Sequence, residues 1–208
     1  MAAKAEESFA KLFWNESKQC LFDVVQNGQG DGAVRPNQVF ALGLAWPLVT
    51  GEEAERVLKV VESELLTPYG LRTLSPKDAN YKQVYSGGVF ERDSAYHQGT
   101  VWPWLIGAYI DAHFRVRGAT NESIAQAQGA LVAFEELMQS TTPGQLPEVF
   151  GGDAPYTPGG CMAQAWSVAE VLRSHVKIRA MKSEIQNVDS SRFAMLLANA
   201  KKSAQTKK

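Results

Sequence analysis

The sequence predicts an all-α fold of about six helices, and three observations support this prediction. Apolar residues recur at helical spacing in several segments, and residues that cap or stop helices bound these segments. Long loops alternate with short turns between the segments. Apolar residues make up 45% of the 208 residues and charged residues 21%, so the chain can bury a core as an ordinary globular domain does.

The first predicted helix covers residues 3–18, and an irregular stretch over residues 19–35 follows it. Gly and Asn are concentrated in residues 27–32 of this stretch, which is typical of a turn. The apolar flanks of the turn can pair as a small hairpin.

A second helix is expected over residues 36–46, because Pro36 suits its first turn and Pro47 stops it. A third helix is expected to begin at Thr50, whose hydroxyl can cap it while Glu53 reaches back in a capping box. The apolar positions of this helix recur at helical spacing: Ala54, Val57, Leu58, Val61 and Leu65.

A long loop over residues 67–97 leads to a fourth helix at residues 100–117. The fifth helix starts near residue 120 and carries one apolar stripe. Another long loop, residues 141–160, precedes a sixth helix over residues 161–173. The stripe of the fifth helix consists of Ile124, Ala127, Leu131, Phe134 and Met138.

The connections between these helices alternate between long and short. If successive helices are antiparallel, the long loops all lie at one end of the molecule. Loops longer than about 12–15 residues are uncommon unless they carry function. This layout is typical of an (α/α)6 toroid whose pocket opens at the long-loop end, with the helices of this chain forming about half of it. An unrelated helical bundle with incidental long loops is the alternative.

The composition excludes several classes of function. A formal net charge of −1 gives no general attraction to nucleic acid or to an acidic membrane. The most apolar stretch, residues 101–110, is too short to span a bilayer, and the N-terminus has no signal-peptide pattern. Cys20 and Cys161 are too few for a disulfide framework or a Cys-based metal site. We therefore expect a cytoplasmic protein with no metal ion, no cofactor, no nucleic-acid partner and no membrane partner.

Aromatic and polar residues are concentrated in the long loops rather than in the helical stripes. Flat aromatic rings cover the apolar faces of sugars, while carboxylates, arginine and amides bond the sugar hydroxyls. This mixture predicts a carbohydrate pocket. The residues concerned include Tyr69, Arg72, Tyr81, Tyr85, Tyr96 and His97, with Trp102, Trp104 and Trp166 near the starts of helices.

Glycoside hydrolysis needs two carboxyl groups that flank the scissile bond. The long loops offer four carboxylates: Glu91, Asp93, Glu148 and Asp153. Glu148 is the strongest candidate, because it lies in a loop punctuated by glycine and proline where the backbone can hold it rigidly. A helix cap or an ion pair with arginine is the alternative role for any one of these carboxylates.

Four blocks of the sequence are distinctive when taken together. They are RPNQVFAL at 35–42, LTPYGLRTLSP at 66–76, RDSAYHQGTVWPW at 92–104, and LPEVF at 146–150 with GCMAQAWS at 160–167. In this order they resemble the amylo-α-1,6-glucosidase family, which is the glucosidase part of glycogen debranching enzymes. The resemblance covers residues 9–173 and leaves the rest of the chain unmatched.

The resemblance implies an (α/α)6 toroid that hydrolyses the α-1,6-linked glucose at branch points of glycogen or a similar α-glucan. It implies inversion of configuration, with Glu148 at the position of the general base that activates water. The family's general acid is an aspartate in a Trp-Met-Asp segment that precedes the matched region, and this sequence lacks that segment. The alternative function is therefore a non-catalytic carbohydrate-binding module or a split-enzyme subunit. The residues expected to bind the substrate are Arg35, Asn37, Asp93, Tyr96, His97, Trp102 and Trp166, with packing as the alternative role for Trp166.

The resemblance also suggests how the chain is organised. Residues 1–175 are expected to form the C-terminal part of the glucosidase domain, and residues 176–208 a basic, partly helical or disordered tail. The N-terminal half of the toroid is then a possible partner. We expect inner helices, such as residues 101–110, to pack against helices that this chain does not contain.

Overall fold

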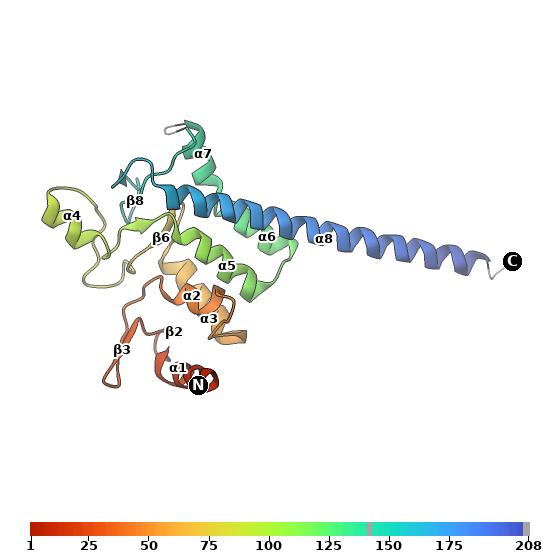
Figure 1. Ribbon diagram of the computed structural model, residues 1–208, viewed down its shortest axis with the longest axis horizontal. Coiled ribbons are helices and arrows are strands. Elements are labelled where there is room, and N and C mark those ends of the chain that lie inside the picture. The colour runs from red at the N-terminus through yellow and green to blue at the C-terminus, as the bar shows by residue number, and fades with distance from the viewer. Residues whose placement is uncertain (141–142, 206–208) are drawn as a thin grey trace.

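The computed structural model describes residues 1–140 and 143–205, with side chains described up to residue 187 (Figure 1). It confirms the predicted helical fold, because helices take up about half of the chain and every strand is short. The helices are α1 (Ala2–Phe13), α2 (Gln38–Gly43), α3 (Gly51–Glu64), α4 (Val89–Ala95), α5 (Leu105–Arg117), α6 (Asn121–Gly129), α7 (Val132–Ser140) and α8 (Ala165–Gln205).

Several helices have bounds that differ from those predicted. α1 ends at Phe13 rather than at residue 18, because strand β1 (Trp14–Asn15) pairs with strand β2 (Cys20–Leu21). α5 begins at Leu105 rather than at residue 100, because the residues before it form strand β7 (Val101–Trp102). α2 is also shorter than expected.

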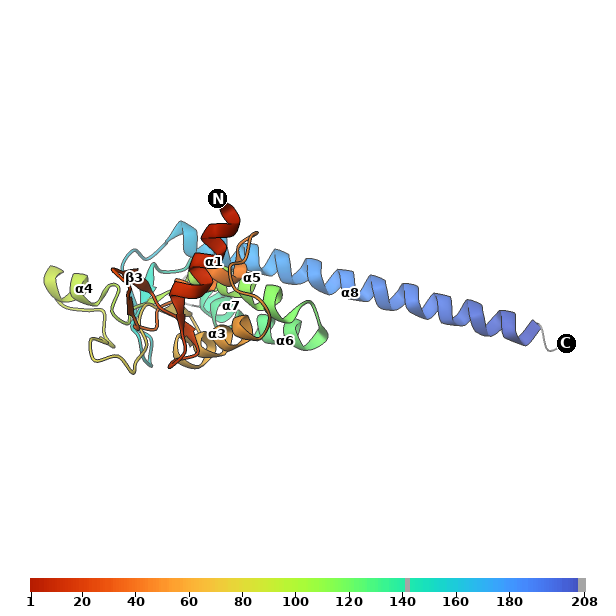
Figure 2. The same cartoon turned by 90° about the horizontal axis from the view of Figure 1, so that it is seen from below.

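The described residues form eight helices rather than about six. The fifth predicted helix consists of two pieces, α6 and α7, and the break follows Gly129, a residue of low helix propensity. α4 is an additional short helix inside the predicted loop 67–97. α8 continues to Gln205 instead of ending near residue 173, since neither glycine nor proline follows Gly160. Figure 2 shows α8 leaving the body of the molecule as a single long helix. Its bounds, Ala165–Gln205, include residue 175, so the helix continues across that position.

The helix starts use different capping chemistry from the one predicted. Thr50 occupies the N-cap of α3, but its side chain makes no capping hydrogen bond, so the predicted capping box with Glu53 is wrong. A capping box is present at α6 instead. There the Thr120 hydroxyl accepts from the Ser123 amide at 3.0 Å, and the Ser123 hydroxyl accepts from the Thr120 amide at 2.9 Å.

α5 lies at the centre of the core. It contacts α2, α3, α6 and α8, and most of its residues are buried. The expectation that residues 101–110 pack against helices outside this chain is therefore wrong, since the chain's own helices cover them. Large exposed apolar side chains lie elsewhere, for example at Trp46 in the loop after α2. In the described part of the chain, no helix combines the length and apolar character needed to cross a membrane.

Short strands join the long loops at one end of the helices. β3 (Val24–Gln26) and β4 (Gln29–Asp31) form the hairpin expected around the turn-rich run. A five-stranded sheet, which was not predicted, has the order β5-β6-β7-β8-β9, and each neighbouring pair is antiparallel. Its remaining strands are β5 (Leu66–Thr67), β6 (Gly70–Arg72), β8 (Val149–Phe150) and β9 (Pro158–Gly159).

The three long loops meet at this end, as the alternation of loop lengths predicts (Figure 1). Pairing of Val101 with Phe150 joins the second loop to the third. The Ser75 amide donates to the Val34 carbonyl at 3.0 Å, which joins the first loop to the second. Residues far apart in the sequence are thereby brought to one end of the molecule.

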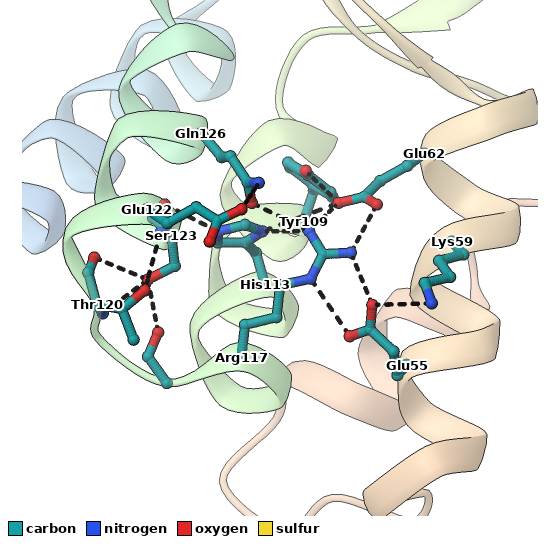
Figure 3. Close-up of polar contacts among 11 residues, drawn as sticks. Glu55, Lys59, Glu62, Tyr109, His113, Arg117, Thr120, Glu122, Ser123 and Gln126 are labelled. Atoms are coloured by element: carbon teal, nitrogen blue, oxygen red, sulfur yellow. Dashed lines mark hydrogen bonds and ion pairs between the residues drawn. The ribbon is translucent and has the colours of Figure 1, made fainter.

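A polar network ties α3, α5 and α6 together (Figure 3). The Arg117 guanidinium binds both carboxylate oxygens of Glu62, at 2.7 and 2.8 Å, and both oxygens of Glu55, at 3.1 and 3.3 Å. The Tyr109 hydroxyl donates to Glu62 at 2.9 Å, and the buried His113 ring contacts the Ser123 carbonyl at 2.9 Å. Tyr109, His113 and Arg117 are spaced at i, i+4 and i+8, so they share one face of α5.

This network predicts how stability depends on pH. Burial opposes ionisation of Glu62, but the hydrogen bonds from Arg117 and Tyr109 and the charge of Arg117 outweigh it and lower the pKa of Glu62 from 4.5 to about 2. Because the folded pKa is the lower one, the stabilisation is present above about pH 4.5 and is lost as pH falls toward 2. It amounts to at most about 3 kcal/mol. Thermal unfolding of wild type and Glu62→Gln should differ at pH 7, and the difference should shrink as the pH falls below about 4.5 and disappear only near pH 2.

The matched control is Glu52→Gln, because Glu52 is exposed on the same helix and pairs only with Arg56 at the surface. This variant should unfold close to wild type at every pH. Equal unfolding temperatures for wild type and Glu62→Gln at pH 7 would contradict the prediction.

Candidate active site

Glu148 lies at the end of the molecule where the long loops meet, directly before β8. Leu146 and Val149 beside it are buried, while Glu148 is half-buried. Its amide donates to the Cys161 carbonyl at 2.8 Å, and its Oε2 accepts from the Cys161 amide at 2.8 Å. Its Oε1 accepts from the Tyr96 hydroxyl. Both carboxylate oxygens are therefore held by donors from two other segments of the chain.

Gly160 provides the space that this carboxylate occupies. Its φ of 68° lies in the left-handed region that favours glycine. A Cβ atom at this position would lie 2.6 Å from Oε2 of Glu148 and 2.9 Å from its Cβ. Any larger residue would thus strain the backbone and displace the carboxylate.

We expect Gly160→Ala to displace the Glu148 carboxylate and break its bond to the Cys161 amide. The matched control is Gly28→Ala, because Gly28 in the turn between β3 and β4 has a φ of 76° but no neighbouring atom within 4 Å of an added Cβ. Both variants should lose about 1–2 kcal/mol for the left-handed backbone. Only Gly160→Ala should also shift the side-chain carboxyl carbon resonance of Glu148 in an NMR spectrum. An unshifted Glu148 carboxyl resonance in Gly160→Ala would contradict this geometry.

Aromatic rings lie next to Glu148. The Tyr96 ring contacts the Trp102 ring edge-on, with centroids 4.7 Å apart. His97 stacks on Trp102 at 5.6 Å, and Trp166 stacks on it at 6.5 Å. Tyr85, on the preceding loop, contacts Tyr96 at 5.6 Å. This row of rings combines residues from the second long loop, β7 and the first turn of α8.

The exposure of these rings differs in a way that matters for ligand binding. Trp102 is only 8% exposed, and its indole nitrogen donates to the Tyr96 carbonyl at 3.0 Å. Trp166 is 46% exposed, and His97 is exposed as well. Trp102 is therefore packed inside the protein, while the rings of Trp166 and His97 are accessible to solvent.

Tyr96 is a neutral donor at ordinary pH. Burial raises the pKa of its hydroxyl, and the hydrogen bond to Glu148 and the charge of that carboxylate raise it further. A neutral tyrosine hydroxyl donates a hydrogen bond to a neighbouring carboxylate, and an ionised carboxylate has no proton with which to donate one in return.

Arg35 and Asn37 lie farther along the loop end. Arg35 donates to the Thr73 carbonyl at 3.0 Å and to the His97 carbonyl at 2.6 Å. Asn37 donates to the Asp23 carboxylate at 2.8 Å. Arg35 therefore holds His97 in place through a hydrogen bond to the His97 backbone carbonyl. Both residues line a groove of about 260 Å³ whose walls include Phe9, Phe13, Phe22, Phe40 and Trp46.

The other loop carboxylates have different surroundings. Asp153 accepts from the Tyr81 hydroxyl at 2.9 Å and from Arg72 at 3.3 Å. Asp93 and Glu91 are exposed on α4. Glu148 thus differs from them, because it alone of these four carboxylates is held by Tyr96 and the Cys161 amide.

Sequence reasoning did not identify several residues of this region. They are the Cys161 amide that binds Glu148, Gly160 that leaves room for the Glu148 carboxylate, and Arg72, which forms an ion pair with Asp153. Each of these contacts joins segments that are distant in the sequence. The adjacent glycines at 159 and 160 were the one signal available, since paired glycines in a loop indicate close approach of other atoms. In the described residues, no group of His, Cys, Asp and Glu side chains is arranged to hold a metal ion.

The helices and the loops gathered at one end define part of a toroid-type helical domain, and a carboxylate beside aromatic rings lies at its loop end. The family model described as amylo-alpha-1,6-glucosidase matches residues 1–173, so the chain belongs to this family. The chain is also 29% identical over 162 residues to the glycogen debranching enzyme of Saccharomyces cerevisiae. That match covers 68% of this chain and 10% of the yeast enzyme, so the chain spans about a tenth of the length of this relative.

A solved structure supports the fold independently. The neutral trehalase of Saccharomyces cerevisiae superimposes with a TM-score of 0.60 at 17% sequence identity. The similarity covers 88% of this chain and 32% of the trehalase chain. At this identity it shows the toroid fold alone.

Proposed function

We propose that the chain is the part of a glycoside hydrolase that carries the general base for cleaving α-1,6-glucosidic branch points of glycogen or a similar α-glucan. The observation that carries the proposal is the Glu148 carboxylate, held by Tyr96 and the Cys161 amide beside a row of aromatic rings. Membership of the amylo-α-1,6-glucosidase family supports it. The yeast relative, a glycogen debranching enzyme, supports the choice of substrate.

In the proposed reaction, Glu148 takes a proton from a water molecule that attacks the anomeric carbon. A general acid on the opposite face of the sugar protonates the leaving oxygen, so the configuration inverts. The two carboxyl groups must lie about 6.5–9.5 Å apart to leave room for the water. Because a carboxylate and a carboxylic acid suffice, the proposed reaction needs no metal ion and no organic cofactor.

The proposed sugar site is the solvent-facing side of the aromatic row. Trp166 and His97 offer exposed ring surface, on which the apolar face of a glucose unit can stack. The Trp102 ring stacks on the His97 ring, and the Tyr96 ring packs edge-on against Trp102. Asp93 is exposed three residues before Tyr96 and offers a carboxylate to sugar hydroxyls. Arg35 and Asn37 act indirectly in this proposal, through the His97 carbonyl and through Asp23.

One observation favours a second candidate function. Asp153 is engaged by Arg72 and Tyr81, and Asp93 and Glu91 lie exposed on α4. None of these placements suits an acid that faces Glu148 across a bound sugar. The chain would then bind carbohydrate without cleaving it, or act as a split-enzyme subunit whose acid comes from the N-terminal half of a toroid. Residues 1–175 would form the glucosidase unit and residues 176–208 a basic tail, of which α8 includes residues 176–205.

We also propose a cytoplasmic location. Cys20 and Cys161 are free cysteines, which suits a reducing compartment. The proposed partner is an α-glucan, with neither a nucleic acid nor a membrane involved.

The test uses a short α-glucan that carries an α-1,6-linked glucose. Binding is followed by tryptophan fluorescence, with Trp166→Ala as the variant that should lose the signal. Glucose release is measured for the chain alone and for the chain mixed with the fragment of the yeast debranching enzyme that precedes the matched segment. Release by the chain or by the mixture supports the hydrolase. Binding without release in either case supports the second function, and the absence of both contradicts the two proposals.

A further inference from the structure

We infer that Tyr96 is a positioning residue whose hydroxyl, together with the Cys161 amide, holds the Glu148 carboxylate in the orientation needed for base catalysis. This inference rests on the proposed function of Glu148. It differs from the direct sugar contact that the sequence predicts for Tyr96, because it assigns the hydroxyl to the carboxylate.

The contacts of the Tyr96 ring fix where its hydroxyl can point. The ring lies between Tyr85 and Trp102, with centroid distances of 5.6 and 4.7 Å. The Tyr96 carbonyl accepts from the Trp102 indole at 3.0 Å, which ties its backbone to β7. The adjacent Ala95 carbonyl accepts from the buried Thr100 hydroxyl at 2.8 Å. Tyr96 is thus held through both ring and backbone.

The other side of the carboxylate is fixed equally well. The Glu148 amide donates to the Cys161 carbonyl, and the Glu148 Oε2 accepts from the Cys161 amide, each at 2.8 Å. Pairing of Val149 with Gly159 extends this link into the sheet. The Tyr96 hydroxyl binds Oε1 and the Cys161 amide binds Oε2, so donors from two segments fix the plane of the carboxylate.

This arrangement suits a general base. A catalytic group must be held within about 0.5 Å of its productive position, and neighbours that lock its rotamer provide this. Each carboxylate oxygen has two lone pairs, so one donor on each leaves the others free for a water molecule. The Tyr96 hydroxyl stays protonated beside the charged carboxylate, since burial and Glu148 raise its pKa.

The first experiment needs no activity and uses the full chain. The Cys161 amide resonance reports the Glu148 carboxylate, because that amide donates to it. Glu148→Gln should move this resonance, and Tyr96→Phe should move it as well. Tyr69→Phe is the matched control, since the Tyr69 hydroxyl has no hydrogen-bond partner among the described side chains and its ring packs on Phe150. A Cys161 resonance that is identical in wild type and Tyr96→Phe would overturn the inference.

The second experiment separates positioning from sugar contact, in whichever form of the protein releases glucose. Tyr96→Phe keeps the ring packing, so KM should stay near the wild-type value. The kcat should fall on the order of 10–100-fold, because misplacing a reacting group by about 1 Å costs that much. A raised KM with unchanged kcat would overturn the inference and make Tyr96 a sugar contact. If Glu148→Gln keeps normal turnover, the proposed function fails, while the Cys161 resonance still decides whether Tyr96 holds the carboxylate.

Discussion

Replacing Glu148 by glutamine should leave glucan binding intact and lower turnover on the order of 10²–10⁴-fold. Glutamine keeps the shape of the side chain, and its amide oxygen can still accept one of the two hydrogen bonds from Tyr96 and Cys161. It cannot accept a proton from water at neutral pH, so only the chemical step is lost. The measurement compares kcat and KM for glucose release with the dissociation constant from tryptophan fluorescence.

Asp93→Asn is the matched comparison for this prediction. Asp93 is an exposed carboxylate on α4, and in the proposed site it positions the sugar. Its replacement should weaken binding and slow turnover together. If Glu148→Gln turns over normally while Asp93→Asn abolishes turnover, Asp93 is the base and the assignment of Glu148 is wrong.

Replacing Phe134 by alanine should destabilise the fold by about 3–5 kcal/mol. Phe134 lies on α7, is fully buried and meets the Tyr69 ring edge-on at 6.1 Å. Truncation leaves a cavity beneath the loop that carries Tyr69, and it removes that aromatic contact. Urea unfolding monitored by circular dichroism measures the effect.

Val132→Ala provides the control on the same helix, because Val132 is 46% exposed. Its effect should stay within about 0.5 kcal/mol, as is usual at the surface. Similar losses for the two variants would show that α7 does not pack on the core as described.

Much of the fold follows from helical periodicity. The stripe predicted for the fifth helix faces the core, since Ile124, Ala127, Leu131 and Phe134 are buried and Met138 is partly buried against them. The alternation of loop lengths predicted that the long loops meet. Periodicity could not predict the five-stranded sheet, because its strands are only two or three residues long and its central pairs, β6–β7 and β7–β8, join segments far apart in the sequence. The same limitation explains the late start of α5, since Val101 and Trp102 pair in that sheet.

The sequence predicted which residues belong to the site, but it did not predict most of the contacts between them. The sequence singled out Glu148, Tyr96, His97, Trp102 and Trp166, and the structure gathers them at one end of the molecule. The rest could not be predicted, because a backbone donor has no sequence signature of its own. The bond from the Cys161 amide and the support that the first loop gives to the His97 backbone are examples.

The configuration of the first glucose released is the most direct test of the account. Proton NMR distinguishes the two anomers within minutes of mixing, before mutarotation equalises them. A base that activates water on the face opposite the leaving group inverts the centre, so cleavage of an α-1,6 bond should release β-glucose, and Glu148→Gln should abolish the signal. Initial release of α-glucose would require a covalent intermediate, and it would contradict the role proposed here for Glu148.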